Sequence, residues 1–250
     1  MTDVHINIKD KPASAASNDA FEKMYLSIRE KEKRVYTDEE VAVLPQIASS
    51  HIHYKEWLVR KRSANRLLSY LKKKKGPVSL LEVGCGNGWL IAKMATIPQS
   101  HAVGIDINNF ELEQARRVFR GKNNLVFLQT DLDQVKLKDE RFDVILFAAS
   151  ISYFNSLENT VSKALSLLNE NGEIHIVDNF LYKRSEIQGA KKRAYDYCKS
   201  LGHADMAGHY FHHCIESLNQ FNHKILFDPS TLENKIFGNR DPFPWVCITK

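Results

Sequence analysis

The sequence predicts an α/β fold in which helices cover both faces of a mainly parallel sheet. Three observations support this prediction. Apolar segments of strand length alternate with helical segments over most of the chain. The apolar run Val78–Val83 is typical of a parallel strand that is buried on both faces. It leads directly into Gly84, Gly86 and Gly88, after which a helical pattern begins at Trp89.

Length and charge are those of an ordinary globular protein. The 250 residues suffice for one α/β domain with a short appendage. The net charge is +5, and the one basic run, Lys72–Lys75, is interpreted as a solvated helix end rather than a nucleic-acid patch. No segment has the length of a membrane span or the character of a secretion signal, so we expect a cytoplasmic protein. Its four cysteines show no Cys-x-x-Cys pairing and are expected to be reduced: Cys85, Cys198, Cys214 and Cys247.

Residues 1–75 are predicted to form a polar tail and a helical cap outside the sheet. The first 19 residues are polar, and we expect a loose end. From Ala20, apolar side chains recur at helical spacing among charges, at Phe21, Met24, Tyr25 and Ile28. Thr37 and Glu40 have the spacing of a capping box, and a longer helix is expected from His51 to Leu71.

The spacing of the glycines restricts the ligand that the loop after Val83 can bind. A dinucleotide fingerprint requires Gly-x-Gly-x-x-Gly, and its last glycine would stand where Trp89 stands. An indole there would obstruct close packing of helix on strand. A phosphate loop is also excluded, because no Gly-Lys-Ser/Thr follows. What remains is a loop open to a nucleoside, or an α/β turn that binds none.

The sequence Glu-Val-Gly-Cys-Gly-Asn-Gly at 82–88 resembles the first motif of class I S-adenosylmethionine-dependent methyltransferases. The next predicted strand ends at Asp106, which matches the acid that binds the ribose hydroxyls in that family. A carboxylate suits a vicinal diol because it accepts from both hydroxyls. The resemblance covers about Val78–Lys250 as a fold, and its specific motifs lie in Leu80–Ser150.

This resemblance implies a doubly wound sheet of seven strands in the order 3-2-1-4-5-7-6, with strand 7 antiparallel. It makes residues 76–250 a Rossmann-like domain with a helical insert at about 183–222. The expected strands are Val78–Val83, His101–Ile107, Leu125–Gln129, Arg141–Ser150, Glu173–Val177, Lys224–Phe227 and Trp245–Thr249. The expected helices between them are Trp89–Ala95, Phe110–Phe119 with its cap at Asn108–Asn109, and Leu157–Leu168, which is followed by a turn at Asn169–Gly172.

The resemblance implies S-adenosylmethionine as the cofactor and S-adenosylhomocysteine as the product. The implied cofactor-binding residues are Glu82, Gly84, Cys85, Gly86, Asn87, Gly88, Asp106, Ile107, Asp131, Leu132, Ala148 and Ser150. Asp131 occupies the place of an acid that bonds the adenine amino group in the family, and the amide of Leu132 that of a donor to a ring nitrogen. The alternative is that Asp131 serves only as a turn or cap residue.

The residues that follow the fourth and fifth predicted strands indicate the type of methyl transfer and whether a metal takes part. The fourth exit lacks the Asp/Asn-Pro-Pro-Tyr/Phe pattern of amino methyltransferases, and its small and aromatic residues predict an apolar wall around the methyl group. Asp178-Asn179 resembles two metal ligands of the catechol type, but Ala148 and Ala149 cannot supply the third. We therefore predict no metal.

The insert is predicted to contain two helices, Ile187–Leu201 and His209–Phe221. The second would place His209, His213 and Glu216 on one face, either as a general base, as a metal site or as ordinary satisfied imidazoles. No catalytic residue is identified, and the candidates are His209, His212 and Tyr153. Candidates for contact with the acceptor are Tyr36, Trp57, Tyr153, Phe154, Asp178, His209 and Tyr210, with His53 and Arg60 as further residues of the cap.

The resemblance predicts an enzyme that transfers a methyl group to a small-molecule acceptor by metal-independent in-line displacement. The sulfonium already makes the methyl carbon electrophilic, so the protein has mainly to align the acceptor and exclude water. Two alternatives stay open: a methyltransferase of RNA or protein, and a non-catalytic S-adenosylmethionine-binding regulator. We expect no nucleic-acid or membrane partner, and a monomer or homodimer.

Overall fold

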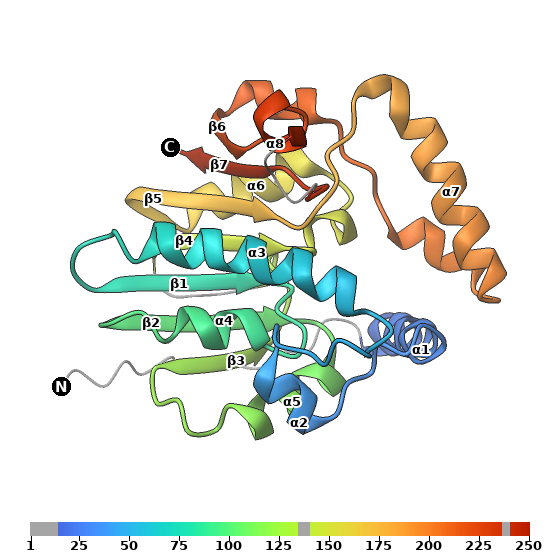
Figure 1. Cartoon of the computed structure of the whole chain (residues 1–250), viewed down its shortest axis with the longest axis horizontal. Coiled ribbons are helices and arrows are strands. Elements are labelled where there is room, and N and C mark those ends of the chain that lie inside the picture. The colour runs from blue at the N-terminus through green and yellow to red at the C-terminus, as the bar shows by residue number, and fades with distance from the viewer. Residues whose placement is uncertain (1–14, 135–140, 237–240) are drawn as a thin grey trace.

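The computed structural model describes residues 15–134, 141–236 and 241–250. Seven strands in this part of the chain form one sheet. They are β1 Val78–Val83, β2 Ser100–Asp106, β3 Leu125–Gln129, β4 Phe142–Ala148, β5 Leu168–Val177, β6 Asn222–Phe227 and β7 Trp245–Thr249. Their order is β3-β2-β1-β4-β5-β7-β6 (Figure 1). All neighbours are parallel except β7, which is antiparallel to β5 and β6, so the predicted fold class and strand order are confirmed.

The described residues also form eight α-helices and four short 3-10 helices. The α-helices are α1 Ala15–Lys31, α2 Asp38–Val43, α3 Tyr54–Leu71, α4 Trp89–Met94, α5 Asn109–Val118, α6 Leu157–Ser166, α7 Ile187–Ser200 and α8 Leu232–Ile236. The 3-10 helices are η1 Ile151–Tyr153, η2 Arg184–Glu186, η3 Ala204–His209 and η4 Ile215–Gln220. The predicted capping box at Thr37 and the cap at Asn108 are both confirmed.

Two apolar cores lie on the two faces of the sheet. Leu80 of β1 faces one core, together with residues of α3, α4 and α5, whereas its neighbour Leu81 faces the other, together with residues of α6. Because a core covers each face, the central strands β1 and β4 are buried along almost their whole length. No helix in the described ranges is long and apolar enough to cross a bilayer.

Strand β5 begins earlier than the sequence predicts. The predicted turn at Asn169–Gly172 is wrong, because these residues continue the strand, which begins at Leu168 opposite Phe142 of β4. Gly172 lies so close to β4 that an added Cβ would be 2.8 Å from the carbonyl oxygen of Phe142. The glycine therefore permits close approach of two strands rather than marking a turn.

The predicted helix at 209–221 is also wrong. A segment without helical structure separates η3 from η4. The amide of Phe211 donates to the Ser152 carbonyl at 2.7 Å, and a bridge joins Tyr182 to Cys214. The expected common face of His209, His213 and Glu216 therefore does not exist.

Helix α1 and the insert lie together beyond the carboxyl ends of the strands (Figure 1). Ile28 of α1, Cys198 of α7 and Met206 of η3 form a third, smaller apolar cluster. Tyr197 of α7 also donates to Glu32, just past the end of α1. The predicted loose tail, residues 1–19, falls mostly outside the described residues. The division into a cap at 1–75 and a sheet domain at 76–250 stays a prediction.

We predict that Trp245→Phe lowers the free energy of unfolding by about 1 kcal/mol more than Trp89→Phe does. The indole of Trp245 donates to Nδ1 of the fully buried His175 at 3.1 Å, and Phe would leave that nitrogen unpaired. Trp89 is also buried, but its indole makes no hydrogen bond to another described residue, so it controls for the lost volume. Urea unfolding of both variants measures the difference, and equal losses would contradict it.

Candidate functional site

A cavity of about 610 Å³ lies at the carboxyl ends of β1, β2 and β4, where α1 and α3 form part of its wall. The wall contains all the predicted cofactor-binding residues except Gly88: Glu82, Gly84, Cys85, Gly86, Asn87, Asp106, Ile107, Asp131, Leu132, Ala148 and Ser150. Gly88 instead serves close packing, because a Cβ on it would lie 2.5 Å from the Phe127 ring.

The loop after β1 is in contact with the loop after β4. Gly84 has a φ of +72°, and a Cβ on it would lie 2.6 Å from the Cβ of Ser150. The hydroxyl of Ser150 donates to the carbonyl of Val83 at 2.6 Å, which fixes the two loops against each other. Bare main chain at Gly84 is therefore required both by its conformation and by this contact.

Main-chain amides hold the carboxylate of Asp106. One oxygen accepts from the amide of Gly86 at 2.7 Å, and the other accepts from the amide of Asn108 at 2.8 Å. Burial raises the pKa of Asp106, whereas these amide donors lower it. Each oxygen keeps a further lone pair, so the side chain offers two fixed acceptors beside the glycine loop.

Glu82 supplies a buried carboxylate with one free oxygen. The side chain is 3% exposed, and its Oε2 has no hydrogen-bond partner among the described residues. Burial raises the pKa of Glu82 well above its ordinary value, which a hydrogen bond from the main chain of Ile91 opposes. A buried polar atom without a partner is costly, so this oxygen is suited to a donor or cation on a bound molecule.

Asp131 is a turn residue and also lies in the wall. Its Oδ1 accepts from the amide of Gln134 at 2.7 Å, as the alternative interpretation expected. Its second carboxylate oxygen accepts no hydrogen bond from the residues that the structure describes.

Helix α1 contributes residues that the sequence analysis assigned only to an apolar helix face or did not mention. Phe21, Tyr25 and Arg29 lie in the cavity wall. The Arg29 guanidinium is 4.7 Å from the centre of the Tyr25 ring and donates to the hydroxyl of Tyr153 at 3.3 Å. The spacing of four residues between the three positions was a signal that they share one face.

A charged network forms the part of the wall that α3 supplies. Arg34 donates to both oxygens of Glu56 at 2.8 and 2.6 Å, and Arg60 donates to it at 3.1 Å. Burial raises the pKa of Glu56, but these two arginines outweigh burial and bring it to about 2. The carboxylate thus stays charged, and much of the positive charge of Arg34 and Arg60 is neutralised locally.

The residues that were predicted to contact the acceptor fall into two groups. Tyr36, Trp57, Tyr153, Phe154 and His209 lie in the cavity wall, as does Arg60. Asp178, Tyr210 and His212 lie outside it, and His53 is bonded to the carbonyl of Glu32 at 2.7 Å.

The three outside residues are nonetheless close to the cavity or buried beside it. The Tyr210 ring packs against that of Tyr153 at 5.7 Å between centroids. Asp178, at the end of β5, is 7% exposed, has a φ of +56°, and has a pKa that burial raises. His212 is 9% exposed.

One group of potential metal ligands exists in the described part of the chain. Donor atoms of Glu173, His175 and Cys247 lie within 4.8 Å of one another. They lie away from the cavity, and Lys74 pairs with Glu173 at 2.8 Å while Trp245 donates to His175. These ligands already have partners, and the absence of a metal stays a prediction.

Comparison with known proteins gives a family match. A family model described as a methyltransferase domain matches residues 74–224. A malonyl-[acyl-carrier protein] O-methyltransferase of Halalkalibacterium halodurans is 28% identical over 133 residues, covering 50% of this chain and 49% of that protein. The 27-O-demethylrifamycin SV methyltransferase of Amycolatopsis mediterranei is 25% identical over 150 residues, covering 56% and 55%. The chain thus spans about half the length of the curated relatives that it matches.

Solved structures show the same fold over nearly the whole chain. Magnesium protoporphyrin IX methyltransferase from Synechocystis, with bound S-adenosylhomocysteine, has a TM-score of 0.60 and 12% identity, covering 94% of this chain and 99% of that one. A plantazolicin methyltransferase in complex with a pentazolic desmethylPZN analog and S-adenosylhomocysteine has a TM-score of 0.55 and 20% identity, also covering 94% and 99%.

We predict that Gly84→Ala destabilises the protein by about 2 kcal/mol or more, because it adds both an unfavourable φ and a clash with Ser150. Gly121→Ala is the matched control, since a Cβ there meets nothing within 4 Å. Denaturant unfolding of both variants measures the effect. Equal stability of the two would show that the loops do not need bare main chain at position 84.

Glu111, in the wall of the cavity, is predicted to make stability depend on pH. Burial, followed by the charge of Asp106, raises the pKa of Glu111 from 4.5 to about 7. The folded protein therefore holds this proton more tightly than the unfolded chain. The contribution is present at pH values below the unfolded pKa and is lost as the pH rises through the folded pKa.

Relative to Glu111→Gln, the wild type should therefore lose stability between about pH 5 and about pH 8. Thermal unfolding across this range measures the difference between the two proteins. The exposed Glu39→Gln is the control and should run parallel to the wild type. A difference between wild type and Glu111→Gln that does not change with pH would contradict the prediction.

Proposed function

Because this chain belongs to the class I S-adenosylmethionine-dependent methyltransferase family, we propose that it transfers a methyl group from S-adenosylmethionine to an oxygen of a small-molecule acceptor. The observation that carries the proposal is the composition of one cavity. Gly84 with its bare main chain, Asp106 with its amide-held carboxylate and Glu82 with its unpartnered, buried oxygen all line the same space. Its volume lies in the range of small-ligand sites.

The residues present fit the cofactor group by group. The free Oε2 of Glu82 suits the ammonium of the amino-acid part, because that oxygen is buried and has no protein donor among the described residues. The two acceptors of Asp106 suit the ribose hydroxyls. Asp131 and the amide of Leu132 are proposed to meet the adenine edge, and the bare loop at 84–87 leaves room for the chain that joins them.

The cofactor supplies a methyl carbon that its sulfonium has already made electrophilic. The residues of this chain have to orient the acceptor and exclude water. Tyr153 and Phe154, at the exit of β4, supply aromatic wall for this, and α1 covers it with Phe21 and Tyr25. We propose direct in-line transfer without a metal.

His209 is proposed as the group that takes the proton from an acceptor hydroxyl. It is exposed in the cavity wall, 5.2 Å from the Phe21 ring between centroids, and an imidazole is the side chain that most often acts as a general base. Burial raises the pKa of Tyr153, so that side chain stays a hydrogen-bond donor rather than a base.

Oxygen as the accepting atom is supported by relatives that are named O-methyltransferases. A small acceptor is supported by the wall itself, where Glu56 offsets the charge of Arg34 and Arg60 instead of leaving a basic face for RNA. The four free cysteines support action in the reducing cytoplasm. A monomer or homodimer is proposed as the oligomeric state.

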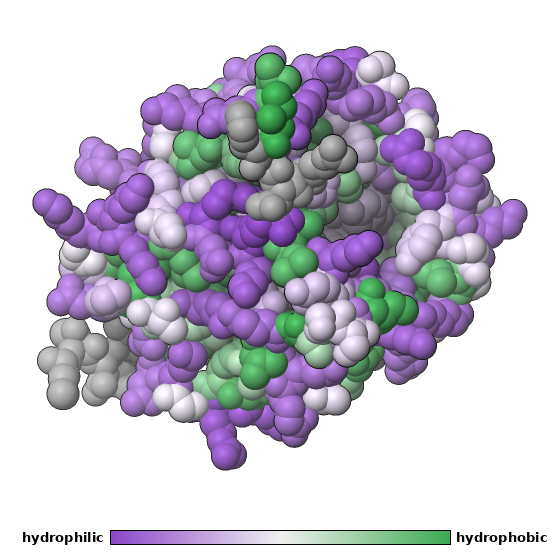
Figure 2. Space-filling view, in the orientation of Figure 1, coloured by the Kyte–Doolittle hydropathy of each residue, from purple (hydrophilic) through white to green (hydrophobic). Residues whose placement is uncertain are grey.

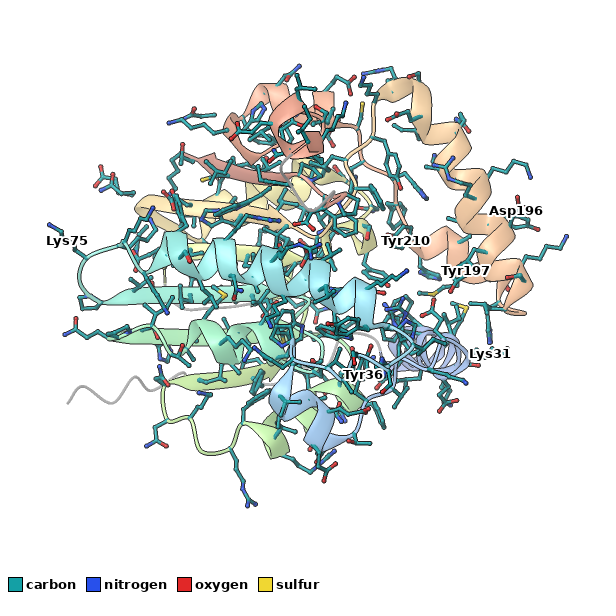
Figure 3. The ribbon with its side chains drawn as sticks, in the orientation of Figure 1. Lys31, Tyr36, Lys75, Asp196, Tyr197 and Tyr210 are labelled. Carbon is teal, nitrogen blue, oxygen red and sulfur yellow. The ribbon has the colours of Figure 1, made fainter. Side chains whose placement is uncertain are left out.

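We predict that Asp106→Ala weakens the binding of S-adenosylmethionine about 100-fold, because two charge-assisted hydrogen bonds to the ribose are lost. Asp196→Ala, on the exposed side of α7 (Figure 3), should bind as the wild type does. Calorimetry with S-adenosylmethionine, and with NAD as a ligand that should not bind, measures both variants. Unchanged affinity in Asp106→Ala, or preference for NAD, would refute the proposed cofactor site.

A screen of hydroxyl, carboxyl and amine acceptors with labelled methyl donor tests the reaction. The expected product carries the label on oxygen. Tight binding of S-adenosylhomocysteine with no product from any acceptor would favour the non-catalytic regulator instead.

A further inference from the structure

A continuous series of rings runs from the surface of the molecule to the cavity. We call it the aromatic series, and in order its members are Phe243, Phe180, Tyr182, His212, Tyr210 and Tyr153. Consecutive ring centroids lie between 4.7 and 5.8 Å apart, within the range of favourable ring contacts. The last member, Tyr153, lies in the cavity wall. The series therefore connects the cavity to the surface.

Separate parts of the chain supply these rings, and main-chain bonds hold them in place. Tyr182 follows β5, and its amide donates to the carbonyl of His213 at 2.9 Å. The amide of Phe211 donates to the carbonyl of Ser152, next to Tyr153. Tyr210 lies between α7 and the strand ends (Figure 3), on a face that is hollowed between α7 and the sheet (Figure 2). The backbone thus positions the series, and only Tyr153 of it lies in the cavity wall. We call the surface that its half-exposed rings line the groove.

The aromatic series is not a sealed packing interface. Phe180 is 47% exposed, and Tyr182, Tyr210 and Phe243 are only half-buried. If these rings served only to attach the insert, folding would be expected to bury them, because exposed aromatic area forgoes the hydrophobic gain. The rings on either side of the buried His212 thus keep apolar surface open, as interaction sites do.

Two polar atoms beside the series have no partner among the described residues. They are Nδ1 of His212 and the hydroxyl of Ser152, on side chains that are 9% and 6% exposed. Burial, then the nearby charge of Lys191, lowers the pKa of His212, so the ring is neutral and keeps one bare nitrogen. Both atoms are buried, and such unsatisfied polar groups call for an explanation beyond packing.

We infer that the aromatic series binds the distal part of an elongated, planar aromatic acceptor, whose methyl-accepting oxygen lies beside Tyr153 in the cavity. This inference rests on the proposed function. Planar rings suit the groove because they stack on or meet the edges of half-exposed rings along its length. The acceptor is then longer than the cavity itself, and its far end lies at Phe180 and Phe243.

The test uses phenol, para-hydroxybiphenyl and para-hydroxyterphenyl as probes, with the full chain saturated with S-adenosylhomocysteine. In the wild type, affinity should rise about tenfold or more from the shortest to the longest probe. Phe180→Ala and Tyr182→Ala should each remove most of that gain for the terphenyl and leave phenol unaffected. Tyr182→Phe, which keeps the ring, should retain the gain.

Tyr195→Ala is the matched control. Tyr195 is 47% exposed, as Phe180 is, but lies on α7 and contacts no other ring of the described residues. The inference is overturned if affinity does not depend on probe length, or if Tyr195→Ala loses as much as Phe180→Ala. It is also overturned if a single-stranded oligonucleotide displaces the terphenyl probe, which would assign the groove to nucleic acid.

The same experiment separates the two proposals. Failure of S-adenosylhomocysteine to bind refutes the proposed function, and the groove with it. Tight binding of S-adenosylhomocysteine together with length-independent probe affinity refutes the groove alone.

Discussion

The carboxylate of Asp106 and its two main-chain donors are the interaction on which the cavity depends. With one oxygen on the amide of Gly86 and the other on that of Asn108, a single side chain joins the end of β2 to the loop after β1 and to the start of α5. The loop is thereby held open at the sheet edge, where Gly84 can approach Ser150 only because it lacks a Cβ. In the proposed function, these elements are already in place for a nucleoside. Such preorganisation raises affinity because less conformational freedom is lost on binding.

Segments outside the sheet supply the rest of the cavity wall. Helix α1 places Phe21, Tyr25 and Arg29 over it, and η1 adds Tyr153. A separate apolar cluster, around Ile28 and its partners on α7 and η3, joins α1 to the insert rather than to the sheet. Helix α1 and the insert therefore form a small unit of their own that packs on the sheet domain through few contacts. Elements that admit ligands are commonly of this kind.

The parts of the structure that could be predicted from sequence are those decided locally. The strand at Val78–Val83, the glycine loop and Asp106 depend on burial and backbone conformation within a few residues, and all were placed correctly along the chain. The course of the chain after His209 could not be predicted, because Phe211 donates to Ser152 in preference to a helical carbonyl. For the same reason, the early start of β5 depended on Phe142, which is distant in sequence, and periodicity alone cannot detect such contacts.

The bond from the amide of Phe211 to the carbonyl of Ser152 also bears on how such a protein diversifies. Neither partner is a side chain, so almost any residue except proline at position 211 preserves the anchorage. Mutation can then replace the side chains that the segment displays without detaching it from the exit of β4. Selection for new acceptors can therefore change the side chains of this segment while its main-chain attachment is kept. The half of the molecule proposed to bind the nucleoside need not change.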